Sequence, residues 1–366
     1  MLKIVPRGYE SRFWRVGSPV LAVVLTGLAM GLIFLAMGRP AALAVYTFFV
    51  APLLQTGGLE ALAVKAAPLI LMGAGLCLAY RANLWNIGAE GQFTLGAIAG
   101  GGVAPALPEA PAALVVPAML LAGLAGGMAG GGLVAWLRVR FNASEILTSL
   151  MLTYIVQYLL IYLVTGPWRD PMGFGFPQTA QFSEEAGAPR LVEGTYLHVG
   201  VLLAPLVAAG LWFVLERSAL GFQFRVLGHA PRAARFAGFR EARLTWVALL
   251  VSGGLAGLAG LLEVAGTIGQ LTPSVSPGYG FAAIIVAFLG RLNPIGMLFS
   301  SLLMALLYLG GESAQMSLNL PQAITQLFQG MMLFFLLACD VLILYRPRLN
   351  RRWARRPAPV AGVGAL

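Results

Sequence analysis

Apolar stretches long enough to cross a lipid bilayer recur along this 366-residue chain, and they restrict its fold more than any other feature. A helix needs about 20 mostly apolar residues to span the hydrocarbon core. Because no water reaches that core, a spanning segment must satisfy its backbone hydrogen bonds internally. Charged residues make up only 10% of the chain, against about 25% in soluble domains. We therefore predict one all-α domain over residues 1–366, a polytopic membrane helix bundle.

About ten segments qualify as crossings, including broken or re-entrant ones. They cover residues 18–37, 62–80, 84–105, 112–137, 145–165, 198–216, 243–262, 279–290, 294–311 and 321–344. Residues 41–58 are also apolar, but prolines and glycines interrupt them, so we interpret this piece as re-entrant or interfacial. The segment 279–290 is too short to span alone, so the irregular stretch before it must complete a broken helix.

The first apolar stretch follows a basic N-terminus, which is also the order found in a cleaved signal peptide. Its apolar core exceeds the roughly 7–15 residues typical of signal peptides, and Gly38-Arg39-Pro40 follows it in place of an A-x-A cleavage site. We therefore expect an uncleaved first helix.

Basic residues are distributed very unequally between the segments that join these crossings. If both termini lie in the cytoplasm, all but four of the 24 lysine and arginine residues face the inside. An excess of Lys and Arg on the inner side is the usual orientation signal of membrane proteins. The exceptions are Arg39, Lys65, Arg169 and Arg190. We therefore predict cytoplasmic segments at 1–17, 217–242 and 346–366.

The longest outer segment, residues 166–197, is acidic and contains several prolines and aromatic side chains. Loops of this length without a helical pattern are often functional. Two interpretations stay open for it: a plain surface loop, or a docking surface for an external protein.

Several kinds of chemistry have no signature in the chain. Its two lysines, Lys3 and Lys65, lie outside any G-x-x-x-x-G-K-[ST] sequence, so no phosphate-binding P-loop is present. The two cysteines and two histidines are far apart and form no metal-ligand motif. We expect no enzyme activity from this chain, and ATP, if it is used, must bind another chain.

Small residues recur at helical spacing in several apolar segments. Gly123–Gly132 contains overlapping pairs of small residues four positions apart. The pairs Gly96 with Gly100 and Gly253 with Gly257 repeat this spacing. Such glycines let helix backbones approach closely in lipid, so we interpret them as packing positions rather than chemical ones.

Polar side chains gather within the apolar stretch around residue 90. Asn83, Asn86, Glu90 and Gln92 lie within ten residues of one another. In a helix over 84–105, Asn86 and Glu90 would share a face, with Asn83 about two turns from Glu90 and Gln92 displaced around the helix. Gly88 and Gly91 would allow a close helix crossing beside them. These residues either line a translocation path or form a structural network between helices, and Glu263 is a second buried acid of this kind.

A second constellation lies in the predicted cytoplasmic segment 217–242. Pro231 suits the first position of a helix, and Gly238 suits the position just past its end. Between them Ala233 and Ala234 are small, and Phe236 is an apolar knob. A helix of about two turns is not stable alone in water, so it needs a partner surface. That surface is either another protein or anionic lipid.

These residues resemble the coupling loop of binding-protein-dependent ABC importers, often written G-x-N-x-x-A-A-x-x-A-G. The matching positions are Gly228, Ala233, Ala234, Ala237 and Gly238. Ala230 stands where the family often has Asn, and this removes a helix cap worth ~1 kcal/mol.

Two further blocks extend the resemblance over most of the chain, from about Leu69 to Tyr345. Residues 86–92 resemble the N-I-G-x-E-G-Q signature of the nucleoside branch of that family. Residues 278–296 are similar to a third shared block. The same family includes permeases of ribose type and of branched-chain amino acids.

The resemblance implies a permease subunit that moves nucleosides across the bacterial inner (plasma) membrane after delivery by an external binding protein. ATP and magnesium would bind a separate cytoplasmic subunit, so this chain would hold no cofactor. A second permease chain, a different one, would complete the transporter, and no nucleic acid would be involved. Coupling to the ATPase is implied for Arg225, Gly228, Pro231, Ala233, Ala234, Phe236 and Gly238. Lining of the translocation path is implied for Asn83, Asn86, Glu90, Gln92 and Glu263.

Two alternative functions remain at this stage. A permease for a simple sugar such as ribose is close in chemistry, because a nucleoside contains a ribose. An ion-coupled secondary transporter belongs to a different class, and broken helices with buried acids suit it as well. The segment 225–243 favours an ABC permease, because a secondary transporter needs no docking helix for an ATPase.

Overall fold

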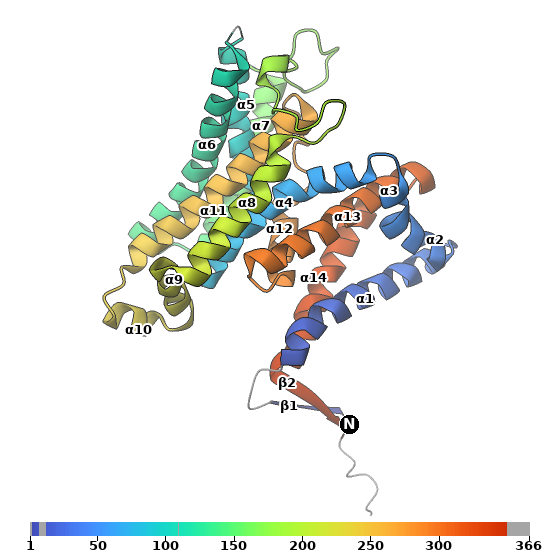
Figure 1. Ribbon diagram of the computed structural model, residues 1–366, viewed down its shortest axis with the longest axis vertical. Coiled ribbons are helices and arrows are strands. Elements are labelled where there is room, and N and C mark those ends of the chain that lie inside the picture. Colours follow the sequence, from blue (N-terminus) through green and yellow to red (C-terminus); the bar gives the residue numbers. More distant parts are fainter. Residues whose placement is uncertain (1, 7–11, 109, 350–366) are drawn as a thin grey trace, which may run out of the picture. The chain divides into compact units, whose positions relative to one another are not determined.

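The computed structural model describes residues 2–6, 12–108 and 110–349. Most of them are helical, and the chain forms two compact units (Figure 1). One unit consists of residues 42–329, and the other combines residues 1–41 with residues 330–366. The predicted class, a polytopic helix bundle, is confirmed.

Most helices belong to the unit formed by residues 42–329. They are α3 (Ala51–Leu54), α4 (Gly58–Arg81), α5 (Ala89–Gly101), α6 (Ala112–Phe141), α7 (Glu145–Thr165), α8 (Val199–Arg217), α9 (Ala219–His229), α10 (Pro231–Phe236), α11 (Glu241–Glu263), α12 (Tyr279–Leu289), α13 (Pro294–Leu318) and the first part of α14 (Ala323–Leu344). Among the described residues, eight helical segments are long and apolar enough to cross a membrane. They are Gly17–Ala36, Gly58–Arg81, Ala112–Phe141, Glu145–Thr165, Val199–Arg217, Glu241–Ile268, Pro294–Leu318 and Ala323–Ile343, and each overlaps one predicted crossing.

The other two predicted crossings are short helices. Helix α12 has 11 residues, as expected for a broken helix. Helix α5 has 13 residues, so the prediction of a continuous helix over 84–105 is wrong. Asn83 adopts a left-handed backbone with φ +57°, and no helix resumes until Ala89. At the other end, residues 104–106 form a separate 3₁₀ turn.

Residues 41–58 are interrupted as their sequence predicts. Helix α2 (Ala41–Val45) continues into a π-helical turn (Tyr46–Val50) and then into α3. Gly57 then turns the chain with φ +77°, and a Cβ added at Gly58 would collide with the Pro52 carbonyl oxygen. The chain therefore folds tightly back on itself before α4 begins.

The unit that contains both ends of the chain is built on helix α1 (Arg12–Ala36) and the second part of α14. The Ser18 hydroxyl donates a hydrogen bond to Asp340 Oδ1 over 2.8 Å. Strands β1 (Leu2–Pro6) and β2 (Tyr345–Leu349) form an antiparallel pair that the sequence did not predict. Most of the predicted cytoplasmic tail 346–366, and Arg7 in the N-terminal segment, lie outside the described residues.

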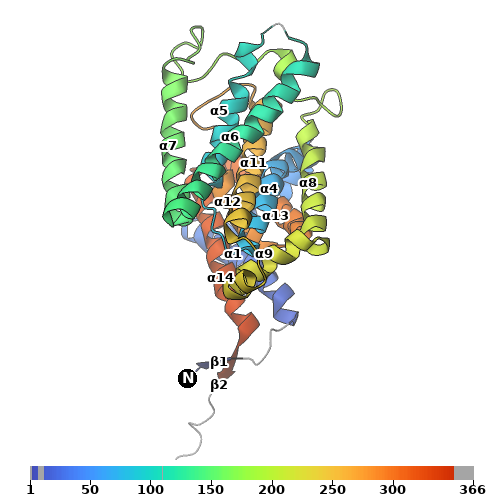
Figure 2. The same ribbon diagram turned by 90° about the vertical axis from the view of Figure 1, so that its left-hand side faces the viewer.

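Helices α4 and α11 form the centre of the larger unit. In the most apolar part of each of these two helices, 78% of the residues are buried, whereas the share is 22% in α6, α7 and α8. Figure 2 shows α7 and α8 on opposite sides of the unit, with α4, α11, α5 and α6 between them. The central helices are apolar all round, which is the pattern expected of buried helices.

Glycines bring α6 and α11 into backbone contact, as their spacing predicts. A Cβ added at Gly127 of α6 would collide with the carbonyl oxygen of Gly253 on α11, and one at Gly253 would collide with that of Gly127. One turn further, Gly257 lies equally close to the backbone of Gly123, and Gly96 of α5 lies against Gly257. Three helices thus meet at one point without intervening side chains, and the glycines act as packing positions.

This contact predicts a large difference between two glycine-to-alanine variants. Gly127→Ala should destabilise the folded protein by about 1–3 kcal/mol, because the methyl group meets a backbone that has no room to move. Gly210→Ala on α8 is the control, since no atom lies within 4 Å of its added Cβ. Thermal unfolding in detergent measures both, and an equal midpoint for the two variants would contradict the packing.

Candidate functional site

The polar stretch around residue 90 is split between a loop and the start of α5. Asn83 and Asn86 precede the helix, so the expectation that they share one helix face with Glu90 is wrong. The physical reason is the left-handed turn at Asn83, which ends α4 and redirects the chain. The exposed side chain of Asn83 accepts a hydrogen bond from Trp85 Nε1 over 3.2 Å.

Asn86 and Gln92 form a reciprocal amide pair inside the bundle. Asn86 Nδ2 donates to Gln92 Oε1 over 2.7 Å, and Gln92 Nε2 donates to Asn86 Oδ1 over 3.1 Å. Asn86 Nδ2 also donates to Ser252 Oγ on α11 over 2.9 Å, and its Oδ1 accepts from the Gly88 N–H. The amide of Asn86 is thus engaged by the loop, by α5 and by α11. For these two residues the geometry favours the structural-network alternative.

Glu90 connects two short helices. Its carboxylate oxygen Oε2 accepts a hydrogen bond from the Gly280 N–H over 2.6 Å, and the side chain is 2% exposed. A Cβ added at Gly280 would collide with the backbone of Glu90, so the first turns of α5 and α12 are in direct contact. The first turn of a helix has N–H groups without an intrahelical partner and a partial positive charge. The Glu90 carboxylate accepts one of these N–H groups and offsets the partial positive charge. Ser276 Oγ accepts two further N–H groups, from Gly278 and Tyr279.

The close crossing predicted at Gly88 and Gly91 is present, and its partner is α7. A Cβ added at Gly88 would meet the Ser149 carbonyl oxygen at 2.7 Å, and one at Gly91 would meet Thr153 Cα at 2.6 Å. Ser149 Oγ also accepts the Ile87 N–H over 3.2 Å. The start of α5 is therefore held between α7 on one side and α12 on the other.

Glu263, the second buried acid, lies at the far end of α11 from the Asn86 network. The Tyr279 hydroxyl, at the start of α12, donates to Glu263 Oε1 over 3.5 Å. The structure thus brings Glu263 and Glu90 both to the start of α12, but it does not place them with Asn83.

The short helix predicted after Pro231 is present as α10, with Pro231 at its first position and Gly238 just past its end at φ +78°. Ala230, at the cap position, supplies no side-chain hydrogen bond. Ala234 is 1% exposed and packs within the chain, whereas Ala233 is exposed and Phe236 is 94% exposed. The surface that α10 offers to a partner therefore consists of Phe236 and its neighbours, not of Ala234.

Helix α9, which leads into α10, contacts the ends of two membrane helices. A Cβ added at Gly228 would collide with the Arg81 carbonyl oxygen at the end of α4. Arg225 pairs with Glu216 at the end of α8 over 3.0 Å, and Arg81 pairs with the same carboxylate over 2.6 Å. Because α10 follows α9 directly in the chain, a displacement of α10 that moves α9 would also move the ends of α4 and α8.

Sequence reasoning missed two acids that organise this end of the bundle. Glu216 joins Arg81 and Arg225, and buried Glu145 pairs with Arg138 over 3.0 Å. Both are isolated acids beside arginines in segments that are otherwise basic. That local pairing of opposite charges was the available signal.

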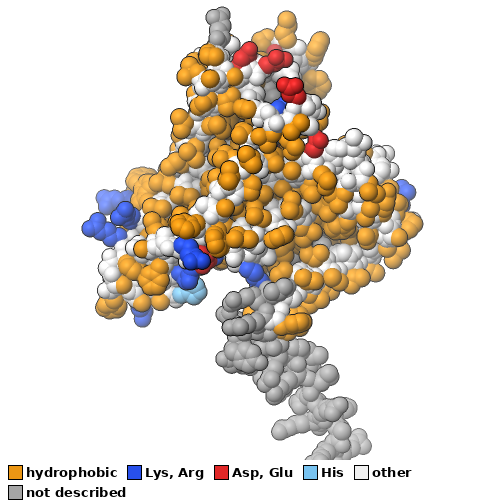
Figure 3. Space-filling model, in the orientation of Figure 1, with side chains coloured by type: hydrophobic (Ala, Val, Ile, Leu, Met, Phe, Trp, Pro, Cys, Tyr) orange, Lys and Arg blue, Asp and Glu red, His pale blue; other side chains and the backbone are white. Residues whose placement is uncertain are grey.

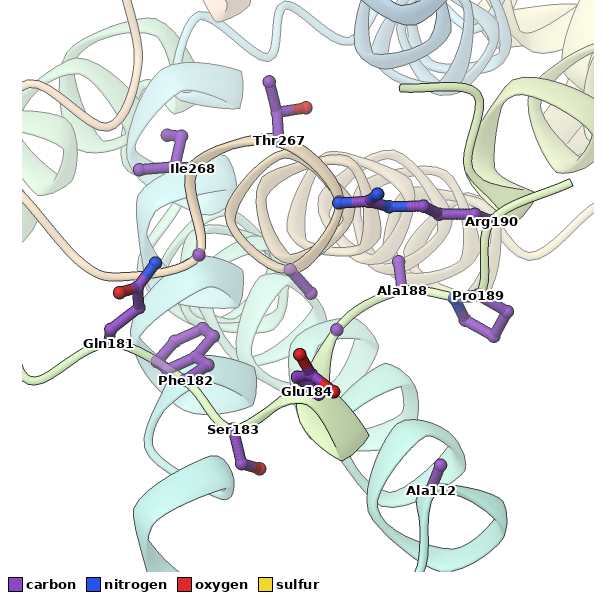
Figure 4. A pocket seen from close by; sticks show the side chains of 14 residues that line it. Ala112, Gln181, Phe182, Ser183, Glu184, Ala188, Pro189, Arg190, Thr267 and Ile268 are labelled. Atoms are coloured by element: carbon purple, nitrogen blue, oxygen red, sulfur yellow. The ribbon is translucent and has the colours of Figure 1, made fainter. Parts of the chain in front are cut away.

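The outer loop 166–197 is attached to the residues that follow α11 by backbone hydrogen bonds. The N–H groups of Thr179, Phe182 and Ala188 donate to the carbonyls of Leu271, Gly269 and Ala265, over 3.0, 2.8 and 2.9 Å. Between loop and helix lies a cavity of about 560 Å³, across which Arg190 extends toward the end of α11 (Figure 4). His198 follows the loop, and burial lowers the pKa of its imidazole, which accepts the Gly200 N–H at Nδ1.

Comparison with known proteins identifies the family of the chain. A family model described as the permease component of branched-chain amino acid transport systems matches residues 58–337. The chain belongs to this permease family. It is a multi-pass membrane protein and the permease component of an ABC transporter, which decides against an ion-coupled secondary transporter.

Three relatives show the range of this family. The glucose ABC transporter permease protein TsgB13 of Haloferax volcanii is 35% identical, over 99% of this chain and 98% of its own. The guanosine ABC transporter permease protein NupP of Bacillus subtilis is 27% identical, over 79% of this chain and 84% of its own. The nucleoside ABC transporter permease protein NupB of Lactococcus lactis is 27% identical, over 87% and 89% respectively.

The contact between Glu90 and Gly280 predicts the behaviour of three variants. Glu90→Ala should lower the stability of the folded permease by about 1–3 kcal/mol, because it leaves a buried N–H unsatisfied. Glu90→Gln keeps one acceptor oxygen and should lie between Ala and wild type. Glu184→Ala, on the exposed part of the outer loop, is the control. Thermal unfolding in detergent measures all three, and a Glu90→Ala midpoint equal to that of the control would refute the role of this contact.

Proposed function

We propose that this chain is the permease subunit of an ATP-driven importer that moves nucleosides across the cell's inner membrane. Family membership supports a permease of the ABC class. The sequence Asn86-Ile87-Gly88-Ala89-Glu90-Gly91-Gln92 supports the nucleoside branch, as do the guanosine and nucleoside permeases among its relatives. Helix α10, with its exposed Phe236, supports the proposal that ATP hydrolysis takes place on a separate subunit that docks on this chain.

A separate cytoplasmic subunit supplies ATP hydrolysis in this proposal, with magnesium bound there. Phe236 of α10 inserts into a groove of that subunit, and burying such a side chain stabilises the contact by about 1.5–3 kcal/mol. Motion of α10 then passes to α4 through Gly228 and to α8 through the Arg225–Glu216 pair. A second permease chain, different from this one, completes the transporter.

The opposite end of the unit receives substrate from an external binding protein. Acidic side chains gather there around the outer loop, whereas Lys and Arg gather around α9 and α10 (Figure 3). This separation supports an assignment of the arginine-rich end to the cytoplasm. We further propose that Glu90 and Glu263 border the translocation path, because both acids lie beside the broken helix α12.

A simple-sugar permease is the second candidate function. One observation favours it: the glucose permease TsgB13 matches nearly the whole chain at 35% identity. Ribose and glucose are neutral and rich in hydroxyl groups, as nucleosides are. A translocation path for either kind of substrate would therefore need similar hydrogen-bonding groups.

Uptake into proteoliposomes that contain the permease, its ATPase and its binding protein tests both candidates. We expect ATP-dependent accumulation of radiolabelled guanosine, adenosine or uridine. D-glucose and D-ribose test the sugar candidate, and L-leucine tests the amino acids named in the family description. Leucine uptake without nucleoside or sugar uptake would overturn the proposal.

Phe236→Ala tests the role assigned to α10. We expect at least a tenfold loss of ATPase stimulation by substrate-loaded binding protein, while the permease stays folded. Phe213→Ala is the matched control, because Phe213 is also an exposed phenylalanine but lies on α8. Full stimulation in the Phe236 variant would show that coupling runs through another element.

A further inference from the structure

A group of buried polar side chains surrounds the start of α12 inside the larger unit. Tyr279 begins this helix, and its ring centroid lies 5.1 Å from that of Tyr308 on α13. The Tyr279 hydroxyl donates to Glu263 at the end of α11. The Tyr308 hydroxyl lies 3.9 Å from the position of a Cβ added at Gly278. Four helices thus contribute polar groups to one place, since Gln329 of α14 lies beside Tyr308.

Three polar atoms of this group are buried and make no hydrogen bond of good geometry among the described residues, although Tyr308 and Gln329 lie within reach of each other. They are Glu263 Oε2, Tyr308 Oη and Gln329 Nε2. Leaving such atoms without a partner is unfavourable, and native structures contain few of them. In a membrane bundle, buried polar groups of this kind commonly mark the path of a substrate or ion.

The three atoms offer complementary chemistry. A carboxylate oxygen only accepts hydrogen bonds, an amide NH₂ only donates them, and a phenolic hydroxyl does both. A sugar hydroxyl also donates and accepts, so adjacent hydroxyls of one ring satisfy this set. The Glu90 carboxylate already compensates the positive end of α12, which disfavours an anionic ligand there.

A partly exposed ion pair lies near this group. Lys65 of α4 and Glu312 of α13 form an ion pair over 2.7 Å, with side chains 20% and 44% exposed. Their charges act on Glu263, so the pair lies close to it. Glu312 and Tyr308 are four residues apart on α13 and therefore share one face of that helix.

We propose that Glu263, Tyr308 and Gln329 form a subsite for the hydroxyl groups of a neutral sugar, either free or as the ribose of a nucleoside. The substrate class rests on the proposed function. The ligand reaches these atoms when the bundle opens during transport, and it enters past the Lys65–Glu312 pair. The subsite recognises hydroxyl groups, so it contributes to substrate selection rather than to ATP coupling.

The test compares parent substrates with analogues that lack one hydroxyl, in the complete proteoliposome system. The probes are guanosine with its 2′-, 3′- and 5′-deoxy analogues, and D-glucose with its 2-, 3- and 6-deoxy analogues. Guanosine and glucose distinguish the two sources of the sugar ring. Each variant is compared with wild type for the same probe, which cancels the selectivity of the binding protein.

We expect Tyr308→Phe to lower uptake of the parent substrate at least tenfold, and to lower uptake of one deoxy analogue less than threefold. Glu263→Gln should show the same pattern, for the same or a neighbouring hydroxyl. Tyr158→Phe is the matched control, because Tyr158 of α7 is exposed, and it should change no uptake rate. Thermal unfolding confirms that each variant is folded.

Two results would overturn the subsite while the proposed function stands. Equal losses for the parent and every deoxy analogue would show that these side chains support packing rather than hydroxyl recognition. Unchanged uptake in both variants would show that water satisfies the buried atoms. If the wild-type complex imports neither nucleosides nor sugars, the proposed function fails and the subsite fails with it.

Discussion

A helix that starts inside a membrane bundle has backbone N–H groups that neither water nor its own preceding turn can satisfy. Helix α12 begins in this way, and the interior of the larger unit is arranged around that requirement. Glu90 accepts one of these N–H groups, and Ser276 accepts two others. The loop before α5 solves the same problem with Asn86, which accepts the Gly88 N–H. The Glu90 carboxylate and the Asn86 amide are therefore needed, before any role in transport, to satisfy backbone N–H groups at the starts of α12 and α5.

Close backbone packing keeps these polar contacts in register. Hydrogen bonds between helices need donors and acceptors placed within a few tenths of an ångström. Where α5, α6 and α11 meet, glycine backbones touch directly, so no flexible side chain can alter the spacing. Gly280 does the same between α12 and α5. The packing glycines and the polar network are thus parts of one arrangement, since the second depends on the first.

The two ends of the unit serve different tasks within this rigid frame. At the arginine-rich end, Glu216 at the end of α8 pairs with Arg225 of α9 and with Arg81 of α4, while Phe236 of α10 is exposed. At the other end, the loop 166–197 is hydrogen-bonded to Ala265, Gly269 and Leu271, which follow Glu263 in the sequence. Helix α11 therefore connects the segment that follows α10 with the outer loop and with the polar group around α12.

The sequence alone determined the class of this protein, because apolar segment length and the distribution of basic residues are local properties. It also predicted α10 from Pro231 and Gly238, whose backbone preferences do not depend on distant residues. Only the tertiary structure decided what Asn86, Glu90 and Gln92 contact. The partners of Asn86 and Glu90 on other helices, Ser252 and Gly280, lie more than 150 residues away, and helical spacing carries no information about them. The sequence analysis placed Asn83 and Asn86 on a helix face that does not exist. The left-handed turn at Asn83, closed by hydrogen bonds from the Asn83 and Leu84 N–H groups to the Tyr80 and Ala79 carbonyls, interrupts the apolar run that was interpreted as one helix.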